Sequence, residues 1–114
     1  MDENQFLVMV DRHVERARLV DSLHSVFPDA QRRKDNSLHL RGNWLEVWPN
    51  DDADENLAAD PTTGYLHFRW RVEVTPLDAS VTEDDQVQLA RDLLTHLRSD
   101  GAAAEVCANF EDRL

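Results

Sequence analysis

The sequence predicts a single α+β domain, residues 1–114, in which two helices cover one face of a mainly antiparallel, five-stranded sheet. Three observations support this fold: five short stretches with strand-like patterns, two stretches with apolar residues at helical spacing, and the order in which they alternate. That order is strand, helix, three strands, helix, strand, which is typical of a two-layer sandwich related to the ferredoxin-like βαββαβ plan with one extra strand. A chain of 114 residues is long enough for one hydrophobic core and too short for two.

The first strand and the first helix are predicted near the N-terminus. Residues 5–10 read QFLVMV, a continuous apolar run of strand length. The helix is expected to have Asp11 as its N-cap and to end near Phe27, because Pro28 disfavours helix at the residue before it. Apolar residues at helical spacing form its expected buried stripe: Val14, Ala17, Val20, Leu23, Val26 and Phe27. The wholly polar segment 31–36 that follows is expected to be a loop.

Residues 37–41 and 44–48 alternate with period two, which predicts a hairpin of two strands. The dipeptide Gly42–Asn43 between them can adopt positive φ and close a two-residue turn, which would pair Arg41 with Trp44. This register separates the side chains by type: Leu38, Leu40, Leu45 and Val47 on the inner face, and His39, Arg41, Trp44, Glu46 and Trp48 on the outer face.

The segment 49–63 has no sustained period, and we expect an acidic loop that is either functional or mobile. It carries five carboxylates: Asp51, Asp52, Asp54, Glu55 and Asp60. A calcium loop of the EF-hand type is excluded, because frames starting at Asp51 or Asp52 lack both the glycine at position six and the glutamate at position twelve. A solvated loop and an acidic contact with a basic partner are the alternatives.

The longest alternating run, residues 65–75, predicts a central strand. Its inner face is expected to carry Leu66, Phe68, Trp70, Val72 and Val74, and its outer face Tyr65, His67, Arg69, Arg71 and Glu73. The second helix should start at residues 80–82 and end at Gly101. Its buried stripe is Val87, Ala90, Leu93, Leu94 and Leu97. Residues 104–110 form the last predicted strand, which adds Glu105, Cys107 and Asn109 to the outer face if it joins the same sheet.

Charge and composition narrow the classes of function. There are 23 acidic and 12 basic residues, a formal charge of -11, so nucleic acids and anionic membranes are disfavoured as partners. The acidity either attracts a basic protein or serves only solubility. Cys107 is the single cysteine and the start Met1-Asp2-Glu3 lacks the pattern of a secretory leader, so we expect a cytoplasmic protein. Eleven of the 12 basic residues are arginine, which favours a bacterial source with a GC-rich genome.

Tryptophan, tyrosine and arginine on one open sheet face are typical of a contact surface for another protein or for a second copy. We therefore predict a non-enzymatic interaction module, whose concrete form is an immunity- or antitoxin-like inhibitor of a basic toxin. The predicted partner-binding residues are Arg41, Trp44, Trp48, Tyr65, His67, Arg69, Arg71, Asp51, Asp52 and Asp54. The alternative is a self-satisfied lattice, with Arg41 stacked on Trp44 and arginines paired with Glu46 and Glu73.

The rival class is a small metal- or ligand-binding, enzyme-like domain. It would use His39, His67, Glu46, Glu73 and Cys107 in a pocket over the sheet. No C-x-x-C or H-E-x-x-H spacing, nucleophile elbow, Walker loop or dinucleotide fingerprint supports it. The sequence therefore predicts no catalytic residue, no metal ligand and no cofactor.

Overall fold

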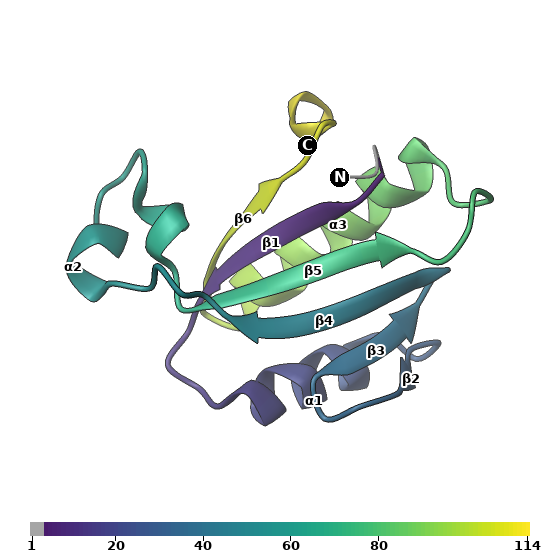
Figure 1. The fold of residues 1–114 in the computed structure, drawn as a ribbon, viewed down its shortest axis with the longest axis horizontal. Helices are drawn as coiled ribbons and strands as arrows, with labels where there is room; N and C mark the ends of the chain where they lie inside the picture. The colour runs from purple at the N-terminus through teal and green to yellow at the C-terminus, as the bar shows by residue number, and fades with distance from the viewer. Residues whose placement is uncertain (1–3) are drawn as a thin grey trace.

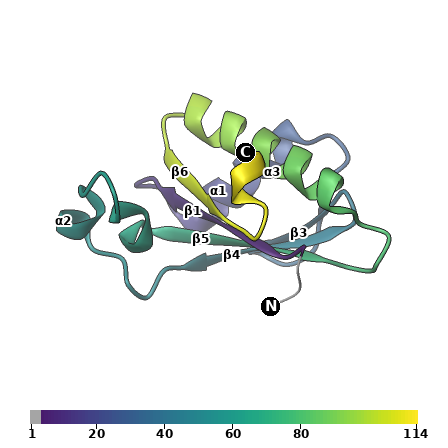
Figure 2. The same ribbon diagram turned by 90° about the horizontal axis from the view of Figure 1, so that it is seen from above.

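The computed structural model describes residues 4–114 as a six-stranded antiparallel sheet with helices packed on one face (Figure 1). The elements follow the chain as β1 (Phe6–Asp11), α1 (Arg16–Val26), β2 (Gln31–Arg32), β3 (Ser37–Leu40), β4 (Asn43–Pro49), α2 (Glu55–Ala58), η1 (Gly64–His67), β5 (Trp70–Pro76), α3 (Glu83–Ser99), β6 (Ala103–Cys107) and η2 (Glu111–Arg113). Figure 2 shows the two layers from the side, with α1 and α3 on the same side of the strands.

The strands lie in the order β2-β3-β4-β5-β1-β6. β1 therefore lies between β5 and β6, the two strands that α3 connects along the chain. The predicted α+β class is confirmed, but the predicted five strands and two helices are each one too few. The additional elements are β2, which has two residues in a wholly polar segment, and the four-residue helix α2. Neither is long enough to show a hydrophobic period.

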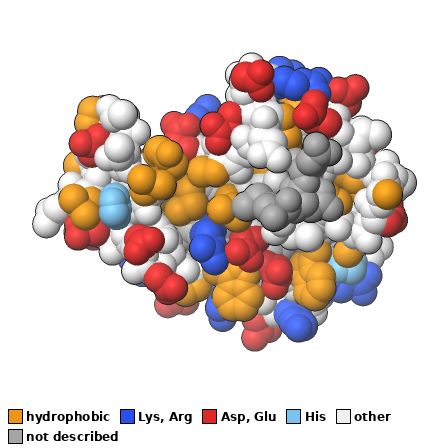
Figure 3. Space-filling model, turned by 45° about the horizontal axis from the view of Figure 1, so that its top comes forward, with side chains coloured by type: hydrophobic (Ala, Val, Ile, Leu, Met, Phe, Trp, Pro, Cys, Tyr) orange, Lys and Arg blue, Asp and Glu red, His pale blue; other side chains and the backbone are white. Residues whose placement is uncertain are grey.

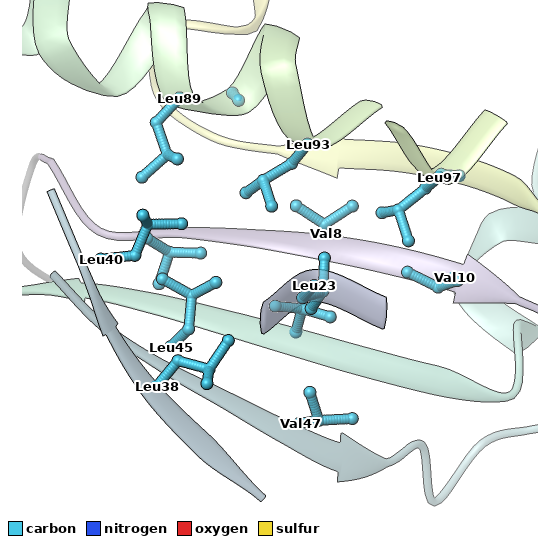
Figure 4. Packing of buried hydrophobic residues seen from close by; sticks show 14 of the residues in the cluster. Val8, Val10, Leu23, Leu38, Leu40, Leu45, Val47, Leu89, Leu93 and Leu97 are labelled. Atoms are coloured by element: carbon cyan, nitrogen blue, oxygen red, sulfur yellow. The ribbon is translucent and has the colours of Figure 1, made fainter. Parts of the chain in front are cut away.

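The core lies between the sheet and the two long helices. Figure 4 shows side chains from both layers pointing toward one another: Leu38, Leu40, Leu45 and Val47 from the sheet, Leu23 from α1, and Leu89, Leu93 and Leu97 from α3. All four aliphatic residues that the hairpin pattern places inside are at most 2% exposed. The period-two pattern therefore assigned the faces of β3 and β4 correctly.

The register of the β3–β4 hairpin differs from the prediction by two residues. The turn is Arg41–Gly42, with φ of 50° and 77°, and Leu40 pairs with Asn43 rather than with Leu45. Asn43 belongs to the strand because its side chain is fully buried and exchanges hydrogen bonds with Gln86 of α3. A shift of two residues leaves the paired side chains of β3 and β4 on their predicted faces, which is why alternation alone could not detect it.

Helix α1 begins later than predicted. Asp11 is the last residue of β1 and does not cap the helix, whose N-cap is Glu15 without a side-chain hydrogen bond. Residues 12–14 connect β1 to the helix, and within them the carbonyl of Val14 accepts a hydrogen bond from the indole of Trp70. The buried face consists of Leu19, Val20 and Leu23, whereas Val26 is 44% exposed.

Helix α3 and the C-terminal strand agree more closely with the sequence pattern. Thr82 and Asp85 form a capping box, and Gly101, with φ of 90°, follows the helix end. β6 ends at Cys107, three residues before the predicted end of the strand. Phe110 then turns back into the core, where its ring lies edge-on to Phe6 at 5.5 Å.

The predicted strand 65–75 begins only at Trp70, so its first five residues were assigned wrongly. Residues 64–67 form the 3-10 helix η1, and Leu66 is 48% exposed instead of buried. The carbonyls of Leu66 and Phe68 accept hydrogen bonds from the side-chain amide of Asn50, which takes the place of a neighbouring strand. Residues 50–69, here called the insert, therefore fold as an ordered extension beyond the end of β4 and β5 (Figure 1).

None of the helices in residues 4–114 has the length and apolar character required to cross a membrane.

Candidate functional site: the open face of the sheet

We call the surface of the sheet opposite α1 and α3 the open face. In residues 4–114 no helix lies over it, since both long helices pack on the other face (Figure 2). Figure 3 views the molecule obliquely from this side and shows hydrophobic side chains among acidic and basic ones. The register places the following side chains on it: Leu7, Met9, His39, Trp44, Glu46, Trp48, Arg71, Glu73, Glu105 and Cys107.

Strand β4 supplies the aromatic part of the open face. Trp44, Glu46 and Trp48 alternate with buried residues and so project on the same side, about 7 Å apart along the strand. Trp48 is 38% exposed, while Trp44 is half-buried. The ring of His39 on β3 lies edge-on to Trp44 at 6.0 Å, and Lys34 Nζ lies 5.9 Å from the centre of the Trp44 ring.

The charges of the open face are only partly paired. Glu46 lies directly opposite Glu73 in the β4–β5 register, an arrangement of like charges that destabilises a sheet. Arg71, opposite Trp48, forms an ion pair with Glu73 at 3.0 Å. Glu46 has no ion pair or side-chain hydrogen bond with any residue in the range 4–114. The alternative of a self-satisfied lattice therefore holds only for the ion pair of Arg71 and Glu73: Glu46 is unpaired, and the buried Nε of Arg71 has no hydrogen-bond partner in residues 4–114.

Arg41 does not lie on the open face, contrary to the prediction. It occupies the hairpin turn, where its guanidinium forms an ion pair with Asp92 of α3 at 2.7 Å and lies 5.4 Å from the centre of the Phe27 ring. Both partners belong to the helical layer. The positive φ of Arg41 removes it from the strand alternation, so the predicted stacking on Trp44 does not occur.

Tyr65, His67 and Arg69 belong to the insert, so their predicted place on the outer face of a strand is wrong. His67 Nδ1 lies 2.8 Å from the carbonyl oxygen of Asp52, which fastens η1 to the acidic segment. Arg69 is exposed and lies 5.6 Å from the Trp70 ring centre and 3.5 Å from His13 Nδ1. Of the seven aromatic and basic residues predicted to bind a partner, the structure brings together Trp44, Trp48 and Arg71 on the open face.

The acidic part of the insert is ordered by its own carboxylates. Asp54 caps α2 by accepting hydrogen bonds from the backbone N–H groups of Asn56 and Leu57. Asp60 accepts from the N–H groups of Thr63 and Thr62, and these bonds lower the pKa of its carboxyl. Asp51 and Asp52 are exposed. Because residues 42–68 contain no lysine or arginine, the insert presents a concentrated negative charge at one end of the sheet.

Two hollows flank the insert. The smaller, about 110 Å³, lies among Asp11, His13, Asp54, His67 and Arg69. The larger, about 480 Å³, separates the insert from β6. The residues that line it include Tyr65, Phe68, Asp11, Asp60 and Glu105, and no lysine or arginine.

The residues of the rival, enzyme-like class do not converge. His39 on β3 accepts a hydrogen bond from Arg33, whereas His67 is bonded to Asp52 in the insert. Within residues 4–114 no three His, Cys, Asp or Glu side chains are grouped so that they could hold a metal ion. Burial, followed by the carboxylates of Glu111 and Glu105, raises the pKa of the Cys107 thiol, which disfavours the thiolate that nucleophilic catalysis requires.

A serine–histidine pair joins the two long helices and was not anticipated from the sequence. Ser22 Oγ of α1 lies 2.9 Å from His96 Nε2 of α3. Asp100 accepts a hydrogen bond from Ser22 and forms an ion pair with Arg12. Ser22 lies within a helix, where backbone N–H groups are committed to helical bonds and cannot form an oxyanion hole. The pair therefore acts as a bridge between the helices, and no local pattern could have revealed it.

Compared with known proteins, the chain matches no family model, and no curated protein or solved structure gives a significant match.

Proposed function

We propose that this protein is a non-enzymatic interaction module that binds a protein with a basic surface through the open face of its sheet. The observation that carries the proposal is the row Trp44, Glu46 and Trp48 on β4, in which an exposed indole adjoins an unpaired carboxylate. Tryptophan and arginine dominate the energetics of protein interfaces, because they bury a large area and retain a polar group. Arg71, opposite Trp48, extends the same surface onto β5.

Charge complementarity favours a basic partner over a second copy of the chain. Two copies would each bring a formal charge of -11 to their interface, whereas a basic protein gains from the same field. The acidic residues Asp51, Asp52 and Asp54 lie in the insert at the end of the sheet, where they would steer a basic partner toward the open face. Tyr65 and His67 of the insert form the adjoining second contact in this proposal.

The concrete form of the proposal is an inhibitor of the immunity or antitoxin kind, directed against a basic toxin. Small size and strong acidity support it, as does a binding surface built on a rigid sheet. We further propose that the fold is a variant of the ferredoxin-like βαββαβ plan. In this proposal β1, β4, β5 and β6 correspond to the four strands of the plan, and β2–β3 is an added edge hairpin.

The test is to capture the partner by chemical cross-linking in cells of the source organism, purify it and reconstitute the complex. The proposal expects a basic protein, a defined stoichiometry and an affinity that falls steeply as salt is raised. A neutral or acidic partner, or an affinity independent of salt, would refute the charge argument. A toxin gene adjacent to the gene for this chain would support the inhibitor form.

A small-ligand function is the second candidate, and the hollow of about 480 Å³ between the insert and β6 is the observation in its favour. Its aromatic and carboxylate lining suits a cationic ligand. Metal analysis of the purified protein separates this class from the first. Stoichiometric zinc or iron that is lost on His67→Ala, a residue of the smaller hollow, would favour an enzyme-like domain. A metal-free protein whose partner binding depends on Trp48 would favour the interface.

A further inference from the structure

We infer that the basic partner contributes an arginine whose guanidinium stacks on the indole of Trp48 and bonds to the carboxylate of Glu46. This inference rests on the proposed function and names the chemistry of its central contact. The two side chains project from the same face of β4 as next neighbours, about 7 Å apart along the strand. A guanidinium stacked on the indole of Trp48 can therefore reach the carboxylate of Glu46.

Glu46 and Glu73 face each other at the centre of the open face, and within residues 4–114 Glu46 lacks a cation. It is half-buried and lies directly opposite Glu73, yet only Glu73 is neutralised, by Arg71 at 3.0 Å. Glu105, at the β6 edge, has Arg98 at 3.6 Å. A cation placed against Glu46 would relieve the repulsion between Glu46 and Glu73 and complete the charge pairing of the sheet centre.

The two indoles that flank Glu46 differ in whether they already hold a cation. The ring of Trp44 has Lys34 Nζ at 5.9 Å from its centre. The other cations stacked on rings in residues 4–114 lie on Phe27 and Trp70, so none of them lies on the exposed ring of Trp48. The vacant position therefore lies on the Trp48 side of Glu46.

Arginine fits this position better than lysine. Its planar guanidinium stacks on an indole and still directs two parallel N–H groups to a carboxylate, whereas an ammonium group is a hydrated point charge. An arginine side chain can thus satisfy Trp48 and Glu46 at the same time. A lysine side chain can contact Trp48 or Glu46, but not both at the same time.

The three tryptophans allow a direct test by NMR of the ¹⁵N-labelled protein at low salt. The probe is N-acetyl-arginine amide, with the lysine analogue and the uncharged citrulline analogue as comparisons. Trp70 serves as the internal reference, because its Nε1 donates to the carbonyl of Val14 at 3.2 Å on the helix-covered face. We expect the indole N–H signal of Trp48 to shift with arginine, to shift less with lysine and to remain unchanged with citrulline and at Trp70.

Two variants of equal charge show whether Glu46 is the carboxylate involved. Glu46→Gln should weaken binding of the arginine probe about tenfold, as expected for the loss of one charge-assisted contact. Glu105→Gln removes the same charge from the same face, at the β6 edge of the sheet, and it should leave the titration almost unchanged. An equal effect of the two variants, or a lysine response as strong as the arginine response, would overturn the inference.

The backbone amide signals separate failure of this inference from failure of the proposed function. If the probe shifts amides of β4 and β5 but Glu46→Gln has no effect, the open face binds cations and the position against Glu46 is wrong. If shifts fall only in the insert or on α1 and α3, the inference and the proposed use of the open face are both wrong. If no signal moves even at millimolar probe, the inference is refuted while the reconstituted complex still tests the function.

Discussion

Replacing Gln86 with leucine should destabilise the domain, because it removes a buried polar contact between α3 and the start of β4. Gln86 and Asn43 are both fully buried. Asn43 Nδ2 donates to Gln86 Oε1 at 3.0 Å, and Gln86 Nε2 donates to Asn43 Oδ1 at 2.8 Å and to the carbonyl of Asn4 at 2.7 Å. This reciprocal pair ties the start of β4 to α3.

The magnitude follows from the bonds that are lost. Gln86→Leu removes three hydrogen bonds worth about 0.5–1.5 kcal/mol each and leaves the buried amide of Asn43 with its single bond to Arg41, while leucine regains part of the loss by apolar burial. We expect a net loss of about 2–4 kcal/mol. With an unfolding entropy of about 2.1 cal/mol/K per residue over 114 residues, the Tm falls by about 8–17 °C.

Urea unfolding followed by tryptophan fluorescence measures this loss. Gln88→Leu is the matched control, because Gln88 is exposed on the same helix and its bond to Asp92 should contribute less than about 0.5 kcal/mol. Asn43→Leu combined with Gln86→Leu should recover at least about 1 kcal/mol relative to the sum of the single changes. A Gln86→Leu variant as stable as the Gln88→Leu variant, or additive single changes, would refute the reasoning.

Three further predictions concern backbone geometry and pH. Gly42→Ala should lower the stability measured by urea unfolding more than Gly101→Ala does. Both glycines have positive φ, but only a Cβ at position 42 would lie 2.9 Å from Val81 Cγ2. Equal losses of stability would contradict this expectation. Gly64→Ala would press a Cβ against the carbonyl of Ala58, so amide hydrogen exchange should accelerate in residues 50–69 and stay slow in the sheet. Unchanged exchange would mean that the contact of Gly64 with Ala58 does not anchor the insert. Burial lowers the pKa of His96 below 6.5, so the unfolded chain binds the proton first and stability falls as the pH drops below about 6.5. His96→Gln should flatten that decline, and an identical pH profile would exclude His96 as its source.

The parts of the fold that the sequence predicts are those in which a local pattern has one physical cause. Alternation in β3, β4 and β5 reflects burial of one face only, so Leu38, Val47 and Val72 lie inside as expected. The start of α3 follows from the capping box of Thr82 and Asp85. In these segments local preference and tertiary packing agree.

The parts that the sequence does not predict depend on contacts between distant residues. Residues 65–69 alternate like a strand, but Asn50 binds their carbonyls and Gly64 packs closely against Ala58, so they form the insert. Arg41 follows the alternation too, yet its positive φ turns it toward Asp92. The predicted surface thus narrows to Trp44, Trp48 and Arg71, with Glu46 emerging as its unpaired charge.

The measurement that tests the central claim most directly is the dissociation constant of the reconstituted complex for two variants. Trp48→Ala removes the exposed indole of the open face, and Val26→Ala removes a side chain that is 44% exposed on the helical layer. We predict about a 30-fold or larger loss of affinity for Trp48→Ala, as for an interface hot spot, and none for Val26→Ala. Full affinity in a folded Trp48→Ala protein, or a loss confined to Val26→Ala, would contradict binding through the open face.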